Sequence, residues 1–232
     1  MKKITAFLPC RKGSERVKNK NTRCFCGVKH GLVEIKLRQL SRCEDIDSII
    51  VSTDDNEVRD IALELKTELG SEISIIMRPP QLATSKTRTD DLIKYVPDLI
   101  DTGSVLWTHV TSPFVDENIY TTAIRKYKKN HDAKLYDSLM SVNTIQTFLW
   151  NENGPLNYDR AKEKWPRTQT LPIWYEINSA IFIAPIEMYK DRTDRIGERP
   201  CLFKLSYPAS IDIDVMDQFV LAESVWKTRF NG

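Results

Sequence analysis

The chain has 232 residues, a length that suits one large α/β domain. Hydrophobic residues make up 41% and charged residues 28%, a balance that excludes extensive disorder and a fibrous chain. A net charge of +2 is too small for a general nucleic-acid-binding surface, and the apolar runs are too short to span a membrane. We therefore expect partners other than nucleic acid or membrane. Because the apolar part of the amino terminus is too short for a signal peptide, we also expect a cytoplasmic location.

The first 130 residues alternate short apolar runs with amphipathic segments. The apolar runs predict strands at 4–8, 46–52, 73–77 and 104–110. The amphipathic segments predict helices at 31–43, 53–69, 89–101 and 116–130. Four strand-then-helix units predict an α/β fold with a doubly wound, mainly parallel sheet and helices on both of its faces.

The alternation changes after residue 135. The later apolar runs predict strands at 136–142, 177–184, 202–205 and 211–214, and an amphipathic helix at 215–230. Residues 151–155 and 165–172 have the composition of loops. We therefore predict a single domain over 1–232, with 136–184 as a small insertion.

A basic loop follows the first predicted strand. Between Arg11 and Lys20 it carries five cations and one acid, together with Gly13 and Ser14. Ligands of open parallel sheets bind beyond the carboxyl ends of the strands, so this loop is placed to bind a phosphate. Its spacing matches neither the dinucleotide fingerprint nor the P-loop, and a solvated surface turn is the alternative interpretation.

Two further segments carry candidate site residues. Asp212 and Asp214 would point to one side of a strand, where their oxygens suit Mg²⁺; alternatively, Asp214 caps the following helix. Thr111 and Ser112 end the fourth predicted strand, where they either line a site or form a turn. His109 is either a hydrogen-bonded strand residue or a reader of a base.

Taken together, the segments resemble the acylneuraminate (CMP-sialic acid) cytidylyltransferases, to which the octulosonate enzymes are related. Residues 8–21 are similar to the nucleotide loop of that family, 50–55 to its second-strand motif, and 78–83 to its arginine-proline-x-x-leucine-alanine segment. Three more matches follow in the order of the family, at 111–113, 178–183 and 212–214. The resemblance implies a nucleotide-diphospho-sugar transferase-like fold.

The resemblance also implies a reaction and its residues. The hydroxyl of an acidic sugar would attack CTP, transferring CMP and releasing pyrophosphate for cell-surface glycan assembly. Arg11 and Lys20 would act on the phosphates, and Asp212 and Asp214 would hold Mg²⁺. The implied nucleotide-binding residues are Leu8, Arg11, Gly13, Ser14, Lys20, Asn21, Arg78, His109, Thr111 and Ser112. The candidates for sugar binding are Gln146, Arg167, Gln169, Tyr175 and Asn178.

The family pairs subunits through the segment after its fourth unit, so the resemblance implies a homodimer formed by 136–184. Two departures indicate a divergent sugar pocket and altered base recognition. His109 stands where the family usually has glutamine, and Ser179 stands where it has glycine. Three alternatives remain: a nucleotidyltransferase for a sugar phosphate or polyol phosphate, a GT-A-like glycosyltransferase with its own Asp-x-Asp motif, and an inactive nucleotide-binding protein.

Overall fold

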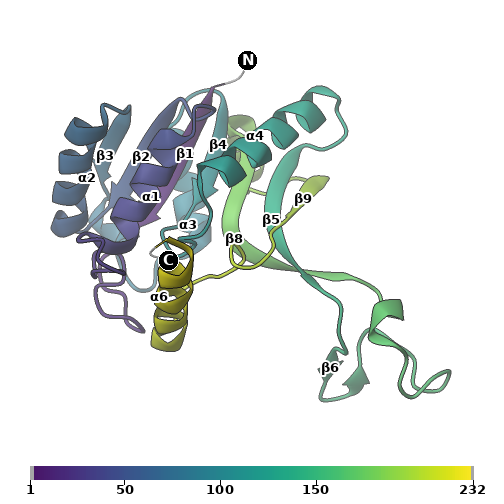
Figure 1. Cartoon of the computed structure of the whole chain (residues 1–232). Helices are drawn as coiled ribbons and strands as arrows, with labels where there is room; N and C mark the ends of the chain where they lie inside the picture. The colour runs from purple at the N-terminus through teal and green to yellow at the C-terminus, as the bar shows by residue number, and fades with distance from the viewer. Residues whose placement is uncertain (1–2, 231–232) are drawn as a thin grey trace.

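The computed structural model describes residues 3–230 and is built around one seven-stranded sheet in the order β3-β2-β1-β4-β8-β5-β9 (Figure 1). The strands are β1 (Ile4–Cys10), β2 (Ser48–Thr53), β3 (Ile73–Met77), β4 (Ser104–Thr108), β5 (Ser138–Ile145), β8 (Trp174–Pro185) and β9 (Pro200–Lys204). The α-helices are α1 (Gly31–Arg42), α2 (Asn56–Leu69), α3 (Thr89–Tyr95), α4 (Glu117–Asp132), α5 (Ile186–Arg192) and α6 (Met216–Phe230). Short 3₁₀ helices lie at η1 (Pro80–Leu82), η2 (Val96–Asp98) and η3 (Thr168–Thr170).

The direction of the strands confirms the predicted mainly parallel sheet. β1, β2, β3 and β4 pair in parallel, as do β5 and β9. β8 runs antiparallel to both of its neighbours, β4 and β5. Chain order reverses between β1 and β4, because β2 and β3 lie on one side of β1 and β4 on the other. In such sheets ligands bind at this switch point, beyond the carboxyl ends of the strands.

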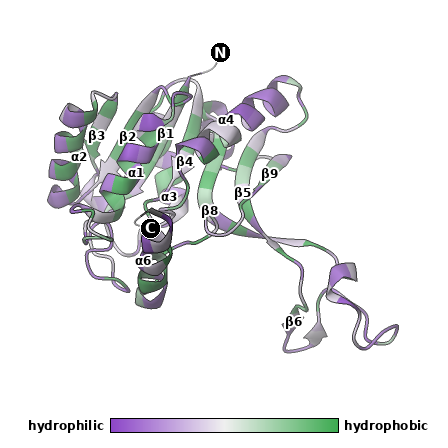
Figure 2. Cartoon of the chain, in the orientation of Figure 1, coloured by the Kyte–Doolittle hydropathy of each residue, from purple (hydrophilic) through white to green (hydrophobic). Residues whose placement is uncertain are grey.

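Helices cover both faces of the sheet, as predicted for a doubly wound fold. One face packs against α1, α2, α4 and α6 in the larger core, and the other packs against α3, η2 and α5. In β1, Ala6 and Leu8 point into the first core and Phe7 into the second, because successive side chains of a strand alternate. A strand buried on both faces reads as a continuous apolar run, and the central strands are green in Figure 2 for this reason.

Prolines and caps account for several element ends. The predicted strand stopped before Pro9, but β1 continues through it to Cys10. Proline lacks a backbone N–H, and because the pairing of β1 with β4 ends at Phe7, Pro9 costs no hydrogen bond to β4. Pro97 ends α3 early, so the predicted helix at 89–101 is a short helix followed by η2. The Asp55 carboxylate accepts a hydrogen bond from the Glu57 amide, 3.0 Å away, and starts α2.

The second half of the chain differs more from the prediction. β5 and β8 belong to the main sheet, and the part of 136–184 that projects from the body is the segment between them, with the short pair β6 (Trp150–Asn151) and β7 (Gly154–Pro155) (Figure 1). We call residues 146–173 the arm. Residues 211–214, predicted as a strand, form an irregular segment, and α5 was not predicted. Within residues 3–230, no helix combines the length and apolar character that a membrane span requires.

Candidate active site

Three segments meet beyond the carboxyl ends of β1 and β4. They are the loop after β1, the turn after β4 and the irregular segment before α6. The Lys20 Nζ atom donates to the carbonyl oxygen of Ile213 at 2.8 Å, and the Ile213 amide donates to the carbonyl oxygen of Thr111 at 2.9 Å. Residues far apart in sequence are thus tied together at the switch point of the sheet.

A charged cluster lies at this junction. The Asp214 carboxylate is 3.5 Å from Lys20 Nζ and 3.3 Å from the Arg16 guanidinium. The Lys20 side chain is 12% exposed, whereas that of Asp214 is 45% exposed. Burial lowers the pKa of Lys20, and the charges of Asp214 and Asp212 oppose this shift. The cluster therefore holds a partly desolvated cation next to an accessible carboxylate.

Asp212 is the more enclosed of the two acids. Burial raises its pKa, a hydrogen bond with the Thr111 side chain lowers it, and the charge of Asp214 raises it. Its Oδ1 atom is buried and has no hydrogen-bond partner in the described part of the chain. Such an orphaned carboxylate oxygen is costly unless a ligand binds it.

These two acids have the chemistry to hold a hard divalent cation. Carboxylate oxygens suit Mg²⁺, which is commonly held by one or two carboxylates and completed by water and substrate phosphates. Across residues 3–230 there is no group of three or more His, Cys, Asp or Glu side chains arranged for a metal. A cation at Asp212 and Asp214 would therefore take its remaining ligands from substrate and water.

The basic loop after β1 is open where a phosphate would approach. Gly13 has φ +77°, a conformation that side chains rarely adopt, and the position of a Cβ there meets open space. The Lys12 amide donates to Asp54 at 2.8 Å, and the Asn21 side chain donates to the Arg11 carbonyl at 3.0 Å. Asn21 therefore shapes the loop.

Other predicted nucleotide-binding residues have side chains committed to the protein. Leu8 and Ser112 are buried, the first in the core and the second within the turn after β4. The Arg78 guanidinium donates to the Ser52 carbonyl at 2.9 Å and to the Leu82 carbonyl at 3.4 Å, linking the end of β2 to η1. A direct contact between Arg78 and a base stays a prediction.

His109 has one ring nitrogen occupied. The indole nitrogen of Trp107 donates to His109 Nε2 at 3.0 Å. The pKa of His109 is lowered to about 3, first by burial and then by the charges of Arg195, Lys20 and Lys36. A neutral ring that accepts at Nε2 carries its proton on Nδ1, so His109 offers a single donor where glutamine offers a donor and an acceptor.

The candidates for sugar binding fall into two groups. The Asn178 amide is buried and pairs with Ser141 and Asn143, so it braces β8 against β5. Gln146 donates to carbonyl groups of the arm, at Gln169 and Leu171. The other candidates are exposed and lie on the arm or next to it: Arg167, Gln169 and Tyr175. Among residues 3–230, no hydrogen bond or ion pair joins the arm to the cluster at Lys20.

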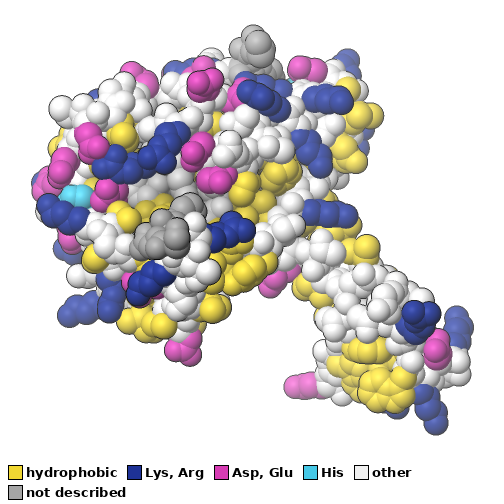
Figure 3. Space-filling model, viewed as in Figure 1, with side chains coloured by type: hydrophobic (Ala, Val, Ile, Leu, Met, Phe, Trp, Pro, Cys, Tyr) yellow, Lys and Arg dark blue, Asp and Glu magenta, His cyan; other side chains and the backbone are white. Residues whose placement is uncertain are grey.

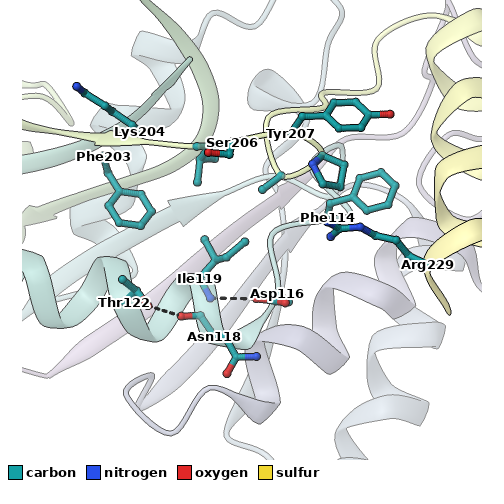
Figure 4. A pocket seen from close by; sticks show the side chains of 13 residues that line it. Phe114, Asp116, Asn118, Ile119, Thr122, Phe203, Lys204, Ser206, Tyr207 and Arg229 are labelled. Carbon is teal, nitrogen blue, oxygen red and sulfur yellow. Dashed lines mark hydrogen bonds between the residues drawn. The ribbon is translucent and has the colours of Figure 1, made fainter. Parts of the chain in front are cut away.

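A separate hollow of about 400 Å³ lies between α4, α6 and the segment after β9 (Figure 4). Phe114, Tyr207 and Arg229 are on its walls. Asp116, which lines it, accepts from the Ile119 amide at 3.0 Å and caps α4. None of the predicted site residues lines this hollow, so the junction of the three segments remains the candidate site.

Sequence reasoning missed Lys36, which is fully buried behind the turn after β4. Its Nζ atom donates to the carbonyl oxygens of Ser112 and Val115 and to the Tyr120 hydroxyl. A signal was present: Leu32, Lys36 and Leu40 follow one another at helical spacing, which puts a lysine on the apolar face of α1.

A cationic glycine-containing loop at the switch point of a doubly wound sheet is typical of α/β proteins that bind nucleotides. Comparison with known proteins defines the family within this class. Residues 5–214 match the model of the cytidylyltransferase family, and the chain belongs to it, which confirms the resemblance stated on sequence grounds.

Similar proteins lie at modest identity. The N-acylneuraminate cytidylyltransferase of Streptococcus agalactiae is 27% identical over 225 residues, which cover 94% of this chain and 52% of that protein. The chain thus spans about half the length of this relative. The CMP-N,N'-diacetyllegionaminic acid synthase of Legionella pneumophila is 28% identical, with 96% of both chains covered. A solved CMP:2-keto-3-deoxy-manno-octonic acid synthetase complexed with CTP has the same fold, with a TM-score of 0.67 at 13% identity and coverage of 98% of this chain and 100% of that one.

Proposed function

We propose that the chain transfers CMP from CTP to the hydroxyl of a sialic-acid-like or other keto-acid sugar and releases pyrophosphate. The observation that carries the proposal is the junction of Lys20, Asp212 and Asp214 at the carboxyl edge of the sheet, in a member of the cytidylyltransferase family. The names of the Streptococcus and Legionella relatives support an acidic sugar as the acceptor. The activated sugar would serve cell-surface glycan assembly.

The reaction needs charge stabilisation more than covalent help from the protein. The sugar hydroxyl oxygen bonds to the α-phosphorus, the bond from that phosphorus to the α,β-bridging oxygen breaks, and the hydroxyl proton is lost to solvent. Negative charge spreads over the phosphate oxygens as pyrophosphate leaves. Arg11 and Lys20 would stabilise that charge, and partial desolvation of Lys20 strengthens its interaction with an anion.

Asp212 and Asp214 would hold Mg²⁺, which would offset the charge of the phosphates. The orphaned Oδ1 atom of Asp212 supports this assignment, because a cation would satisfy it. Before substrate binds, Lys20 and Arg16 neutralise Asp214. Arrival of a metal-bound triphosphate would let these cations turn from the carboxylate to the phosphates.

We further propose a homodimer formed through the arm. The arm and the adjoining start of β8 expose large apolar side chains, and Figure 3 shows apolar side chains gathered on the projecting part. The exposed side chains are Trp150, Leu156, Trp165, Ile173, Trp174, Tyr175 and Ile177. An exposed cluster of aromatic side chains is typical of a protein interface. A partner's arm would bring Arg167 and Gln169 to the sugar bound at the Lys20 cluster of the other chain.

The proposal is tested by incubating the protein with CTP, Mg²⁺ and a panel of keto-acid sugars, and measuring pyrophosphate and the CMP-sugar by mass spectrometry. UTP, GTP and ATP with the same acids test base preference, and sugar phosphates and polyol phosphates test the alternative acceptors. The matched control is Lys20→Met, which keeps the length of the side chain and removes its charge. No product from CTP with any acid would refute the proposal, whereas product with a polyol phosphate alone would establish the alternative.

A further inference from the structure

Lys36 lies at the centre of a buried polar network that nothing in the proposed reaction uses. It is 0% exposed, and its Nζ atom lies 2.9 Å from the Ser112 carbonyl oxygen, 3.0 Å from the Val115 carbonyl oxygen and 2.9 Å from the Tyr120 hydroxyl. Beyond Tyr120, the hydroxyl groups of Tyr120 and Thr108 are 2.7 Å apart, and Thr108 is 2.7 Å from the Ala180 carbonyl oxygen. The network joins α1, α4, β4 and β8.

The direction of each hydrogen bond in this network follows from the number of protons available. The Ala180 carbonyl can only accept, so the Thr108 hydroxyl donates its single proton there. Thr108 must then accept from Tyr120, whose phenol keeps its proton because burial raises the pKa of Tyr120. With that proton used, the Tyr120 oxygen accepts from Lys36.

All three partners of Lys36 therefore accept, which matches the three donors of an ammonium group. Burial lowers the pKa of Lys36, and the charge of Asp116 opposes the shift. A neutral amine has only two protons and would leave one of the three acceptors unpaired. The arrangement of acceptors thus selects the charged form of Lys36.

The same network is connected to Asp212 through the turn after β4. Lys36 and Gln39, one turn apart on α1, hold three carbonyl groups of the turn after β4; Gln39 donates to the Pro113 carbonyl at 2.6 Å. The turn begins at Thr111, whose carbonyl oxygen accepts from the Ile213 amide and whose side chain hydrogen-bonds Asp212. A path of direct contacts therefore runs from Lys36 through the turn to Asp212.

We propose that Lys36 is a positioning residue: its buried ammonium group fixes the turn at 111–115 and, through Thr111, the place of the Asp212 carboxylate. The importance of that carboxylate for catalysis rests on the proposed function. The positioning itself does not, and it can be measured without nucleotide, metal or acceptor.

The test is amide hydrogen exchange in the free protein, read at the Ile213 amide. Lys36→Met keeps the volume and removes the donors, which leaves buried carbonyl groups unpaired. We expect exchange at Ile213 to accelerate by about tenfold or more in this variant. Ile93→Ala is the control, because it destabilises the core on the opposite face of the sheet. It should accelerate exchange at Ile213 no more than it does at Ile49 in β2.

Equal acceleration at Ile213 and Ile49 in Lys36→Met would overturn the proposal, since it would show only a general loss of stability. If Lys36→Met does not fold, Tyr120→Phe decides the question, because it removes one acceptor of the ammonium group. If exchange accelerates selectively at Ile213 in Tyr120→Phe, the proposal is supported. If exchange at Ile213 does not accelerate selectively in this variant, the proposal is refuted. An inactive wild-type protein with the expected exchange pattern would refute the proposed function and leave the positioning role intact.

Discussion

Replacing His109 by glutamine should make the free energy of unfolding depend less on pH below about pH 6.5. The pKa of His109 is lowered to about 3, first by burial and then by the charges of Arg195, Lys20 and Lys36. An unfolded histidine takes up a proton below about pH 6.5, whereas the folded protein does not until about pH 3. Between these values the unfolded state binds more protons, so the free energy of unfolding decreases as the pH falls.

The size of this effect follows from the two pKa values. Between pH 6.5 and pH 5 the linkage amounts to about 1.5 kcal/mol, and because this window lies well above the folded pKa, the figure depends little on that value. Urea unfolding of the wild type and His109→Gln at both pH values measures it, since other titrating groups are common to the two proteins. The wild type should lose about 1.5 kcal/mol more than the variant over this interval. Identical losses would show that His109 titrates normally and would refute its desolvation beside Trp107.

Further variants test Asp212, the arm and the contact of Arg78 with the end of β2. Asp212→Asn should lower kcat by at least about 100-fold, as for the loss of a transition-state charge contact. At pH 8 the variant should also have a higher free energy of unfolding. Burial raises the pKa of Asp212, so the ionised carboxylate destabilises the folded state, and the neutral amide removes that cost. Kinetics and urea unfolding measure the two effects, and a stable variant with full activity would contradict the role of Asp212 in catalysis. Trp165→Ser, at a side chain that is 70% exposed, should weaken the dimer in sedimentation experiments. A monomeric wild type would exclude that role. Arg78→Met should cost about 2 kcal/mol of stability, because it removes the hydrogen bonds from the guanidinium to the Ser52 and Leu82 carbonyls. An unchanged melting temperature would argue against a role for Arg78 in holding η1 against the end of β2.

The first half of the fold was predictable because its signals are local. Apolar runs were enough to predict β1, β2 and β3. The remaining errors were the predicted end of the first strand before Pro9 and the predicted continuation of the third helix past Pro97, and both depend on the surroundings of the proline. Pro9 is tolerated because the pairing of β1 with β4 has already ended at Phe7. Where that pairing ends is set by the tertiary structure and cannot be predicted from the local sequence. The reversed direction of β8 and the place of β5 within the main sheet depend on pairings between distant segments, which periodicity does not encode.

The candidate site was predictable in its charged residues and unpredictable in its supports. Sequence motifs pointed to Lys20 and Asp214, which the fold brings to 3.5 Å. The predicted strand at 211–214 was wrong because the segment is held by the Thr111 carbonyl and Lys20 rather than by a ladder. Lys36 was not singled out from the sequence. Its spacing with Leu32 and Leu40 places it on the apolar face of α1, but the sequence does not reveal the three acceptors that enclose its ammonium group.

The most direct test of the central claim is the fate of each phosphate of CTP. The protein is incubated with a keto-acid sugar, Mg²⁺ and CTP that carries radioactive phosphorus at either the α or the γ position. Our account predicts that the α label appears in the sugar product and the γ label in pyrophosphate. With Lys20→Met, neither labelled product should form. Label from the γ position in the sugar, or α label only in free CMP or CDP, would contradict nucleotidyl transfer.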